Sequence, residues 1–208
     1  INQFIMKFKK PKFWDYKKPS ILSYLFFPLS LLLTILKSFK NLTTKKKKYS
    51  KIKTICVGNI YLGGTGKTSL SLKINEILKD KIKTCFIKKY YSDQIDEQKI
   101  LSNHGKLFKF KDRSSSIKQA INENFELAIF DDGLQDPSID YDYSIVCFNI
   151  DNWIGNSFTI PAGPLRENIK NLKKYKNVFL NGNNENIDNI IKFVHNLDPN
   201  IKVYKGEY

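Results

Sequence analysis

Residues 58–69, GNIYLGGTGKTS, combine closely spaced glycines with a lysine and hydroxyl residues. Backbone N–H groups in such a loop can surround a phosphate, and the start of a following helix adds partial positive charge. The ammonium of Lys67 would reach the β- and γ-phosphates of a nucleotide, and the hydroxyl of Thr68 would bind Mg²⁺. We therefore predict a phosphate loop, which binds a nucleotide through Tyr61, Leu62, Gly63, Gly64, Thr65, Gly66, Lys67 and Thr68.

The loop departs from the strict pattern G-x-x-x-x-G-K-[ST] at one position, because Tyr61 stands where the pattern has glycine. A glycine turn without a ligand is the simpler alternative, but it would leave Lys67 and Thr68 unexplained. We expect a β-carbon at any of the three loop glycines to keep the backbone from wrapping the β-phosphate. The phosphate loop is therefore the favoured interpretation.

Two adjacent carboxylates, Asp131 and Asp132, follow an apolar run at the predicted carboxyl end of a strand. Ligands of open α/β sheets bind at this edge, and a Mg²⁺–nucleotide site needs a carboxylate there. A turn that begins with Asp-Asp-Gly is the alternative interpretation of the motif by itself. Together with the phosphate loop, the pair predicts that one of the two aspartates binds Mg²⁺, directly or through water, and the sequence favours neither.

Alternating short apolar runs and amphipathic segments must position these residues. Their order predicts an α/β fold of the P-loop NTPase type, with a mostly parallel sheet and helices on both faces. The length of 208 residues favours one main domain, at residues 51–208. Helices are predicted at 67–80, 114–124 (with serine caps) and 185–196, and strands at 52–58, 83–88, 125–132, 143–150, 177–182 and 201–206.

Residues 19–36 carry no charge and lie between lysine-rich flanks. As a helix this segment would reach roughly 27 Å, close to the ~30 Å of a bilayer's hydrocarbon layer, and Pro28 would kink it. Three interpretations stay open: a tilted membrane span, a helix in the membrane interface and a buried core helix. A signal peptide is disfavoured because no small-residue cleavage site follows. The lysine run 45–48 fits an anionic membrane surface or a solvated linker, and we expect residues 1–50 to form a separate, membrane-associated region.

The net charge of +15 would by itself suggest an anionic partner. Lysine supplies 33 of the 35 basic residues, however, and asparagine and isoleucine are also abundant, which is typical of compositional drift. Since no nucleic-acid recognition motif is present and aromatic residues do not interleave with the basic runs, we expect no nucleic-acid partner. The two arginines, Arg113 and Arg166, are by contrast positions where lysine would serve less well.

The cysteines and histidines do not have the spacing of metal ligands. Each cysteine lies in an apolar run, which predicts buried free thiols in a reducing compartment. Both histidines lie in polar surroundings and should be exposed. The residues concerned are Cys56, Cys85, Cys147, His104 and His195.

Four motifs together resemble the tetraacyldisaccharide 4'-kinase family of the lipid A pathway in Gram-negative bacteria: GNIYLGGTGKT, DDGLQ (131–135), GN (155–156) and PAGPLRE (161–167). PAGPLRE is the most specific of them, and the resemblance runs from the apolar N-terminal segment to about Asn181. It implies transfer of the γ-phosphate of ATP, with Mg²⁺, to the 4'-hydroxyl of a lipid A disaccharide 1-phosphate at the cytoplasmic face of the inner membrane. An enzyme held at the bilayer could reach such an acylated substrate, and we expect a monomer.

The resemblance also implies roles for single residues. Lys67 and Thr68 match the family's phosphate loop, and Asp131 and Asp132 match its metal-binding pair. Asp96, at the start of DEQKIL, resembles an aspartate that acts near the acceptor hydroxyl, so it is a candidate base; a solvated acid in a charged loop is the alternative. Arg166 of PAGPLRE would orient phosphate or the acceptor, in a role that lysine's point charge does not fill.

Three departures leave other functions open. The family's Ser-Arg-Gly-Tyr-Gly stretch is replaced by IKKYYSDQ (87–94), and Asp136 stands where histidine is usual. Family members continue well beyond Tyr208, so we expect a chain truncated at its C-terminus. A degenerate copy that binds nucleotide without phosphorylating is one alternative. A membrane-associated switch of the MinD/ParA type is another, although Leu62 stands where such proteins carry a signature lysine.

Overall fold

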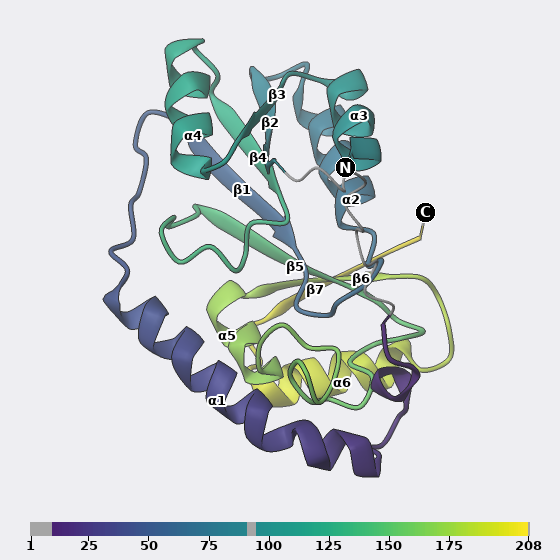
Figure 1. Ribbon diagram of the computed structural model, residues 1–208. Coiled ribbons are helices and arrows are strands. Elements are labelled where there is room, and N and C mark those ends of the chain that lie inside the picture. The colour runs from purple at the N-terminus through teal and green to yellow at the C-terminus, as the bar shows by residue number, and fades with distance from the viewer. Residues whose placement is uncertain (1–9, 91–94, 208) are drawn as a thin grey trace, which may run out of the picture.

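Short apolar runs form one parallel sheet in the computed structural model, which describes residues 10–90 and 95–207. The strand order is β3-β2-β4-β1-β5-β6-β7, and every neighbouring pair is parallel. The sequence prediction of a mostly parallel sheet is therefore confirmed. The strands are β1 (Lys53–Gly58), β2 (Thr84–Lys89), β3 (Leu107–Phe110), β4 (Leu127–Asp131), β5 (Tyr143–Asn149), β6 (Asn177–Asn181) and β7 (Lys202–Gly206) (Figure 1).

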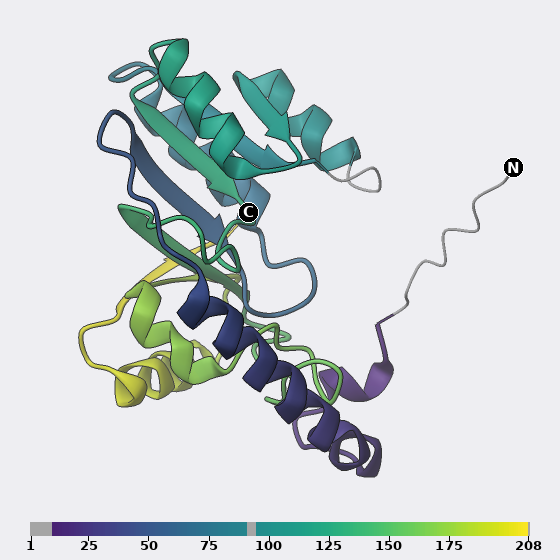
Figure 2. The same ribbon diagram turned by 60° about the vertical axis from the view of Figure 1, so that its left-hand side comes forward.

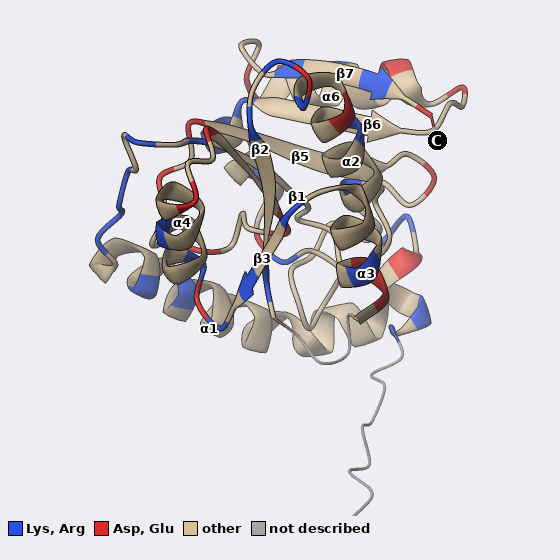
Figure 3. Ribbon diagram, turned by 90° about the horizontal axis from the view of Figure 1, so that it is seen from above, with Lys and Arg blue, Asp and Glu red and all other residues tan. Residues whose placement is uncertain are grey.

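Helices cover both faces of the sheet, as the alternation of strands and helices predicts. Figure 3 shows α2 and α3 on one side of the central strands and α4 on the other. Strand β4 contributes to both layers, because Ile129 belongs to the same buried cluster as Leu70 of α2, whereas Phe130 belongs to the cluster that contains Ile117 of α4. The helices are α1 (Ile21–Thr43), α2 (Lys67–Leu78), α3 (Ile95–His104), α4 (Arg113–Asn122), α5 (Leu172–Tyr175) and α6 (Ile187–Leu197), with 3-10 turns η1 (Lys12–Asp15) and η2 (Ile169–Asn171).

The carboxyl edge of the central strands collects the segments that carry the motifs. Strand β1 lies between β4 and β5, so the loop that leaves β1 emerges between two strands of the same direction. The segments after β4 and β5 leave the sheet at the same edge. Open α/β sheets bind ligands at this kind of position.

The sequence did not indicate α3 or β3. Strand β3 is only four residues long, and α3 carries few apolar residues, so neither segment shows a clear period of buried residues. The predicted serine cap of α4 is wrong, because Asp112 caps this helix and accepts a hydrogen bond from the backbone N–H of Ser115 at 2.8 Å.

Helix α1 buries two serines against the protein, while most of its aliphatic side chains are exposed. Ser30 is 1% exposed, and its hydroxyl donates a hydrogen bond to the carbonyl oxygen of Thr159. The hydroxyl of Ser23 accepts a hydrogen bond from the side-chain amide of Asn156. Ile21 and Leu25 are by contrast 87% and 70% exposed. The interpretation as a buried core helix is therefore wrong. Figure 2 shows α1 lying along the outside of the molecule.

By length and composition α1 is long and apolar enough to cross a membrane. Only 11% of its most apolar 18-residue stretch is buried. The helix begins with a capping box at Ser20 and continues through Pro28 without ending. It runs on to Thr43, beyond the uncharged segment 19–36.

The predicted burial of the thiols and exposure of the imidazoles are confirmed. The three cysteines are free and buried, and burial raises the pKa of the Cys56 and Cys85 thiols to about 12. Both histidines are exposed. None of these side chains belongs to the arrangement described next.

Candidate active site

The glycine-rich loop connects the end of β1 to the first residue of α2, as predicted. Gly66 takes a left-handed conformation (φ 81°) immediately before Lys67, where a side chain would be strained. A β-carbon at Gly64 would meet no heavy atom within 4 Å, so there is open space beside the loop. The hydroxyl of Thr65 is buried without a hydrogen-bond partner among the described residues. The loop is therefore an open cradle at a helix N-terminus, with an unsatisfied polar atom inside.

The PAGPLRE segment holds this loop in place. The N–H of Leu62 donates to the carbonyl oxygen of Pro164 at 2.8 Å, and that of Arg166 donates to the carbonyl oxygen of Ile60 at 2.6 Å. Gly163 of the same segment is tightly enclosed, because a β-carbon there would lie 2.0 Å from Oδ1 of Asn156. The GN and PAGPLRE motifs thus pack against each other and against the loop.

The side chain of Tyr61 packs beside Gly63, where a β-carbon would lie 3.1 Å from Cε1 of the ring. The ring is 1% exposed, and its hydroxyl donates to Asp15 and accepts from Lys10. Burial, with a further contribution from the Asp15 carboxylate, raises the pKa of Tyr61. The residue that replaces glycine in the strict pattern therefore connects the loop to the segment before α1, while its backbone remains in the cradle.

Asp131 and Thr68 lie together at the mouth of the cradle. The hydroxyl of Thr68 donates to Oδ2 of Asp131 at 3.2 Å. The other carboxylate oxygen, Oδ1, is buried with no hydrogen-bond partner among the described residues. Burial raises the pKa of Asp131, an effect that the ammonium of Lys88 opposes. A hydroxyl and an unpartnered carboxylate oxygen beside a phosphate cradle fit the oxygen ligands that Mg²⁺ prefers.

Lys88 belongs to the site, although no motif in the sequence indicates it. Its side chain is 1% exposed, and its Nζ donates to Oδ2 of Asp131 at 2.6 Å and also to Glu97 of α3. Burial would lower the pKa of Lys88, but the two carboxylates outweigh that effect and raise it. The sequence signal was a lysine at the end of an apolar strand, FIKK, which lysine-rich composition disguised.

Asp132 forms a second ion pair, with Arg166. Nη1 of Arg166 donates to Oδ1 of Asp132 at 2.6 Å and to Oε1 of Gln135 at 3.1 Å. Burial alone would raise the pKa of Asp132, but the charges of Arg166 and Lys67 outweigh it and lower the pKa. Gln135 also donates to the backbone carbonyl of Asn59, at 3.0 Å. The DDGLQ motif therefore joins PAGPLRE to the phosphate loop.

Asp96 lies in the first turn of α3 with its side chain exposed. Among the described residues, no hydrogen bond or ion pair joins it to the other predicted site residues. Its neighbour Glu97 reaches Lys88 and through it Asp131. The alternative described Asp96 as a solvated acid in a charged loop; the side chain is exposed, as that alternative predicts, but it lies in a helix and not in a loop. Of the substituted stretch IKKYYSDQ, residues 91–94 lie outside the described residues.

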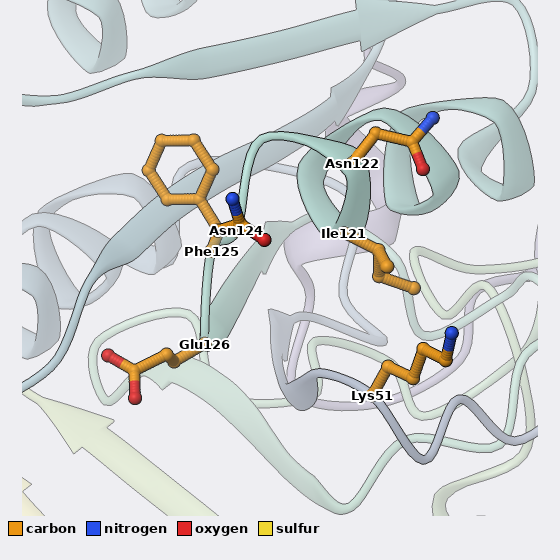
Figure 4. A pocket seen from close by; sticks show the side chains of 6 residues that line it. All are labelled: Lys51, Ile121, Asn122, Asn124, Phe125 and Glu126. Atoms are coloured by element: carbon orange, nitrogen blue, oxygen red, sulfur yellow. The ribbon is translucent and has the colours of Figure 1, made fainter.

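A cavity of about 490 Å³ lies at the amino-terminal edge of the central strands, opposite the phosphate loop. It is next to the start of β1 and β4, away from every predicted site residue. Figure 4 shows that its polar side chains do not converge, because Asn122 and Glu126 point to opposite sides. Its lining residues are Lys51, Ile121, Asn122, Asn124, Phe125 and Glu126.

Known proteins resemble this chain in sequence. The sequence model of one family, described as tetraacyldisaccharide-1-P 4'-kinase (LpxK), matches residues 22–110 and 96–205. The tetraacyldisaccharide 4'-kinase of Pelagibacter ubique is 58% identical over 204 residues, and that of Rickettsia bellii is 34% identical over 202 residues. These alignments cover 98% and 86% of this chain, but 64% and 61% of the two relatives' own lengths.

A solved structure resembles it in fold. The crystal structure of an "apo" form of LpxK from Aquifex aeolicus in complex with ATP aligns with a TM-score of 0.67, over 90% of this chain and 82% of that one. At 20% sequence identity, this similarity concerns the fold. It agrees with the parallel sheet, the surrounding helices and the apolar N-terminal helix.

Proposed function

The chain belongs to the tetraacyldisaccharide 4'-kinase family, and from this membership we propose that it transfers the γ-phosphate of ATP to the 4'-hydroxyl of a tetraacyldisaccharide 1-phosphate, a lipid A precursor. An open phosphate cradle and basic groups beside it support the proposal, and Asp96 would supply the acidic group that phosphoryl transfer to a hydroxyl uses. The observation that carries the proposal is the unpartnered Oδ1 of Asp131, buried beside Thr68 at the mouth of an open phosphate loop.

We assign the nucleotide to the cradle formed by residues 61–68. Loop N–H groups would surround the β-phosphate, and Lys67, at the first position of α2, would contact the β- and γ-phosphates. Asp131 and Thr68 would hold Mg²⁺, while Asp132, already paired with Arg166, is the weaker candidate for a direct ligand. When bound, Mg²⁺ would neutralise charge on the phosphates during transfer.

We assign the acceptor to the side of the site that Asp96 and Arg166 flank. Asp96 would accept the proton of the 4'-hydroxyl, and its position depends on α3, which Glu97 joins to Lys88. Arg166 would orient phosphate or the acceptor, because Asp132 and Gln135 fix its guanidinium in one orientation.

We propose that α1 attaches the protein to the cytoplasmic face of the inner membrane, where ATP and an acylated acceptor meet. Its apolar side chains are exposed, and its buried serines fix it to the segment that holds the phosphate loop. Residues 1–50 would then serve attachment and residues 51–208 phosphoryl transfer, in a monomer. A helix that spans the bilayer and one that lies in its interface would both satisfy this arrangement.

The test is phosphate transfer from radiolabelled ATP to the disaccharide 1-phosphate in lipid vesicles. Lys67→Ala should abolish transfer, and Lys73→Ala, an exposed position of the same helix that pairs with Glu76, should retain it. Full activity of Lys67→Ala would refute the assignment. Calorimetric ATP binding without transfer by the wild type would instead identify a degenerate copy. ATP-dependent cycling on and off vesicles without an acceptor would identify a switch.

A further inference from the structure

Residues 10–16, which we call the strap, pack onto the segment that carries the GN and PAGPLRE motifs. Nε1 of Trp14 donates to the carbonyl oxygen of Pro161 at 2.9 Å, and the N–H of Asn156 donates to the carbonyl oxygen of Trp14 at 3.0 Å. A β-carbon at Gly155 would lie 2.2 Å from the same oxygen. Figures 1 and 2 show η1 and the first half of α1 beside this segment. The strap is therefore fixed to the part of the protein that also holds the phosphate loop.

One side chain of the phosphate loop reaches the strap directly. The hydroxyl of Tyr61 donates to Oδ1 of Asp15 and accepts from Nζ of Lys10, and the same Nζ lies 4.4 Å from the centroid of the ring. Tyr61 is 1% exposed, whereas the side chain of Asp15 is 42% exposed. Phenylalanine would fill the same buried space, so packing alone does not account for the hydroxyl and its two charged partners.

The ring of Tyr61 also packs against the phosphate loop itself. A β-carbon at Gly63 would lie 3.1 Å from Cε1 of the ring. In addition, Nδ2 of Asn59 donates to the carbonyl oxygen of Gly63 at 3.1 Å. The ring and the amide thus restrict the backbone of Gly63, whose N–H belongs to the proposed cradle. A less ordered Tyr61 would leave that N–H less well placed for a phosphate.

Backbone contacts hold the loop even without the strap. Tyr61 pairs with Leu165 in an antiparallel bridge, and the N–H of Leu62 donates to the carbonyl oxygen of Pro164. Loss of the hydroxyl contacts should therefore leave the loop folded but less ordered. A ligand that must order its loop pays for this in affinity, and contacts that order the loop beforehand reduce that cost.

We propose that Tyr61 is a positioning residue that couples the phosphate loop to the strap, so that nucleotide binding and attachment of the strap favour each other. Such a coupling is reciprocal, because a contact that strengthens nucleotide binding is itself strengthened by the nucleotide to the same extent. The inference rests on the nucleotide site of the proposed function and adds a role for the strap. It also gives a reason for tyrosine at a position where the strict pattern has glycine.

Affinity for ATP tests one half of the coupling, by calorimetry on the full chain without an acceptor. Tyr61→Phe keeps the ring beside Gly63 and removes the hydroxyl contacts, so it should bind ATP about fivefold more weakly, at the lower end of typical coupling between sites. Asp15→Asn should also weaken ATP binding, although Asp15 lies outside the cradle. Tyr16→Phe, at an exposed position of the strap, is the matched control and should bind ATP like wild type.

Thermal unfolding checks that each of these variants is folded. Wild-type ATP affinity in folded Tyr61→Phe would overturn the proposal. Should that variant not fold, Asp15→Asn decides, because Asp15 is half exposed and its replacement removes only the charged end of the contact. Wild-type affinity in Asp15→Asn would then overturn the proposal.

Hydrogen exchange of the strap tests the reciprocal half, and a merely structural role of Tyr61 would not change it. Saturating ATP should slow exchange of the amides of residues 10–16 in wild type by about the factor seen in the affinities, but not in Tyr61→Phe. Residues 187–197 of α6 serve as the internal control and should not change. Unaltered exchange of the strap in wild type, or slowing that is equal in α6, would overturn the proposal.

Transfer assays separate this proposal from the proposed function. With the disaccharide acceptor, Tyr61→Phe should change KM for ATP more than kcat, because the lost contacts act on nucleotide binding. If wild type binds ATP with the coupling described but transfers no phosphate, the proposed function fails and the coupling stands. If it transfers phosphate while Tyr61→Phe equals it in ATP affinity, the coupling fails and the function stands.

Discussion

Nζ of Lys88 lies 2.6 Å from Oδ2 of Asp131, and both side chains are fully buried between neighbouring strands β2 and β4. The same ammonium contacts Glu97 in the first turn of α3. One buried cation therefore connects the proposed metal ligand to the helix that carries Asp96. It occupies one oxygen of Asp131 and leaves the other, Oδ1, unpartnered.

Replacing Lys88 should destabilise the protein strongly. Lys88→Met would leave the buried carboxylate of Asp131 without its cation, and breaking a buried pair in this way costs about 3–5 kcal/mol. Urea unfolding at neutral pH measures the change. Lys109→Met, at an exposed position of β3, should change stability by less than about 0.5 kcal/mol. Adding Asp131→Asn to Lys88→Met should restore part of the loss; if it deepens the loss, the carboxylate is not what Lys88 stabilises.

Replacing two glycines of the site by alanine should affect different properties, stability at Gly163 and ATP affinity at Gly64. A β-carbon at Gly163 would lie 2.0 Å from Oδ1 of Asn156, so Gly163→Ala should lower the free energy of unfolding by more than about 2 kcal/mol. A β-carbon at Gly64 would meet nothing within 4 Å, so Gly64→Ala should fold normally. It should nevertheless weaken ATP binding about tenfold or more, since the methyl group would occupy the space proposed for phosphate. Thermal unfolding and calorimetry measure the two effects, and normal ATP affinity in Gly64→Ala would contradict the cradle.

The ion pair between Nη1 of Arg113 and Oδ2 of Asp136, which lie 3.2 Å apart, should make stability depend on acid pH. Burial would raise the pKa of Asp136, but hydrogen bonds from Ser138 and the charge of Arg113 outweigh it and lower the pKa. A carboxyl with a lowered folded-state pKa stabilises the fold above its unfolded pKa, near 4, and loses that contribution as the pH falls through the folded pKa.

Asp136→Asn should therefore cost on the order of 1 kcal/mol at pH 7 and less at pH 3. Urea unfolding of variant and wild type at the two pH values measures the difference. Asp188→Asn, at an exposed position of α6, is the matched control for removing one surface carboxylate. A cost that is equal at both pH values would mean that the charge of Asp136 does not contribute.

Elements whose residues carry a period or a motif could be predicted from the sequence. Strands β1, β4 and β5 are continuous apolar runs because helices cover both of their faces, and the phosphate loop follows from glycines ahead of Lys67. Contacts between distant segments carry no such signal. The pairing of PAGPLRE with the phosphate loop, and of Lys88 with Asp131, arises only when the strands align.

Composition concealed two further features. Lysine is so frequent that neither the buried Lys88 nor the basic end of α1 differs from its surroundings in the sequence. The rarity of arginine marked Arg113 and Arg166 as unusual, but the pocket that both side chains line depends on α4 and PAGPLRE meeting in space. The apolar composition of α1 likewise did not reveal that its serines, rather than its leucines, face the protein.

The two sides of α1 should have separable roles. Leu25 and Leu32 are 70% and 53% exposed, so replacing both by serine should leave stability within about 0.5 kcal/mol of wild type. If these side chains enter the bilayer, the same variant should bind vesicles less tightly in a flotation assay, because less apolar surface is transferred from water to lipid.

Ser30→Leu is the converse change, since it adds apolar area to the helix at a buried position. The hydroxyl of Ser30 donates to the carbonyl oxygen of Thr159 at 2.8 Å and accepts from the N–H of Ala162 at 2.9 Å. The leucine variant therefore leaves that carbonyl oxygen and that N–H without a hydrogen-bond partner. We expect a loss of about 1–3 kcal/mol in the free energy of unfolding without weaker vesicle binding. If the serine substitutions at Leu25 and Leu32 leave flotation unchanged, the exposed side of α1 does not face the membrane. The reason to expect otherwise is that Ser23 and Ser30 face the protein, whereas Leu25 and Leu32 are exposed.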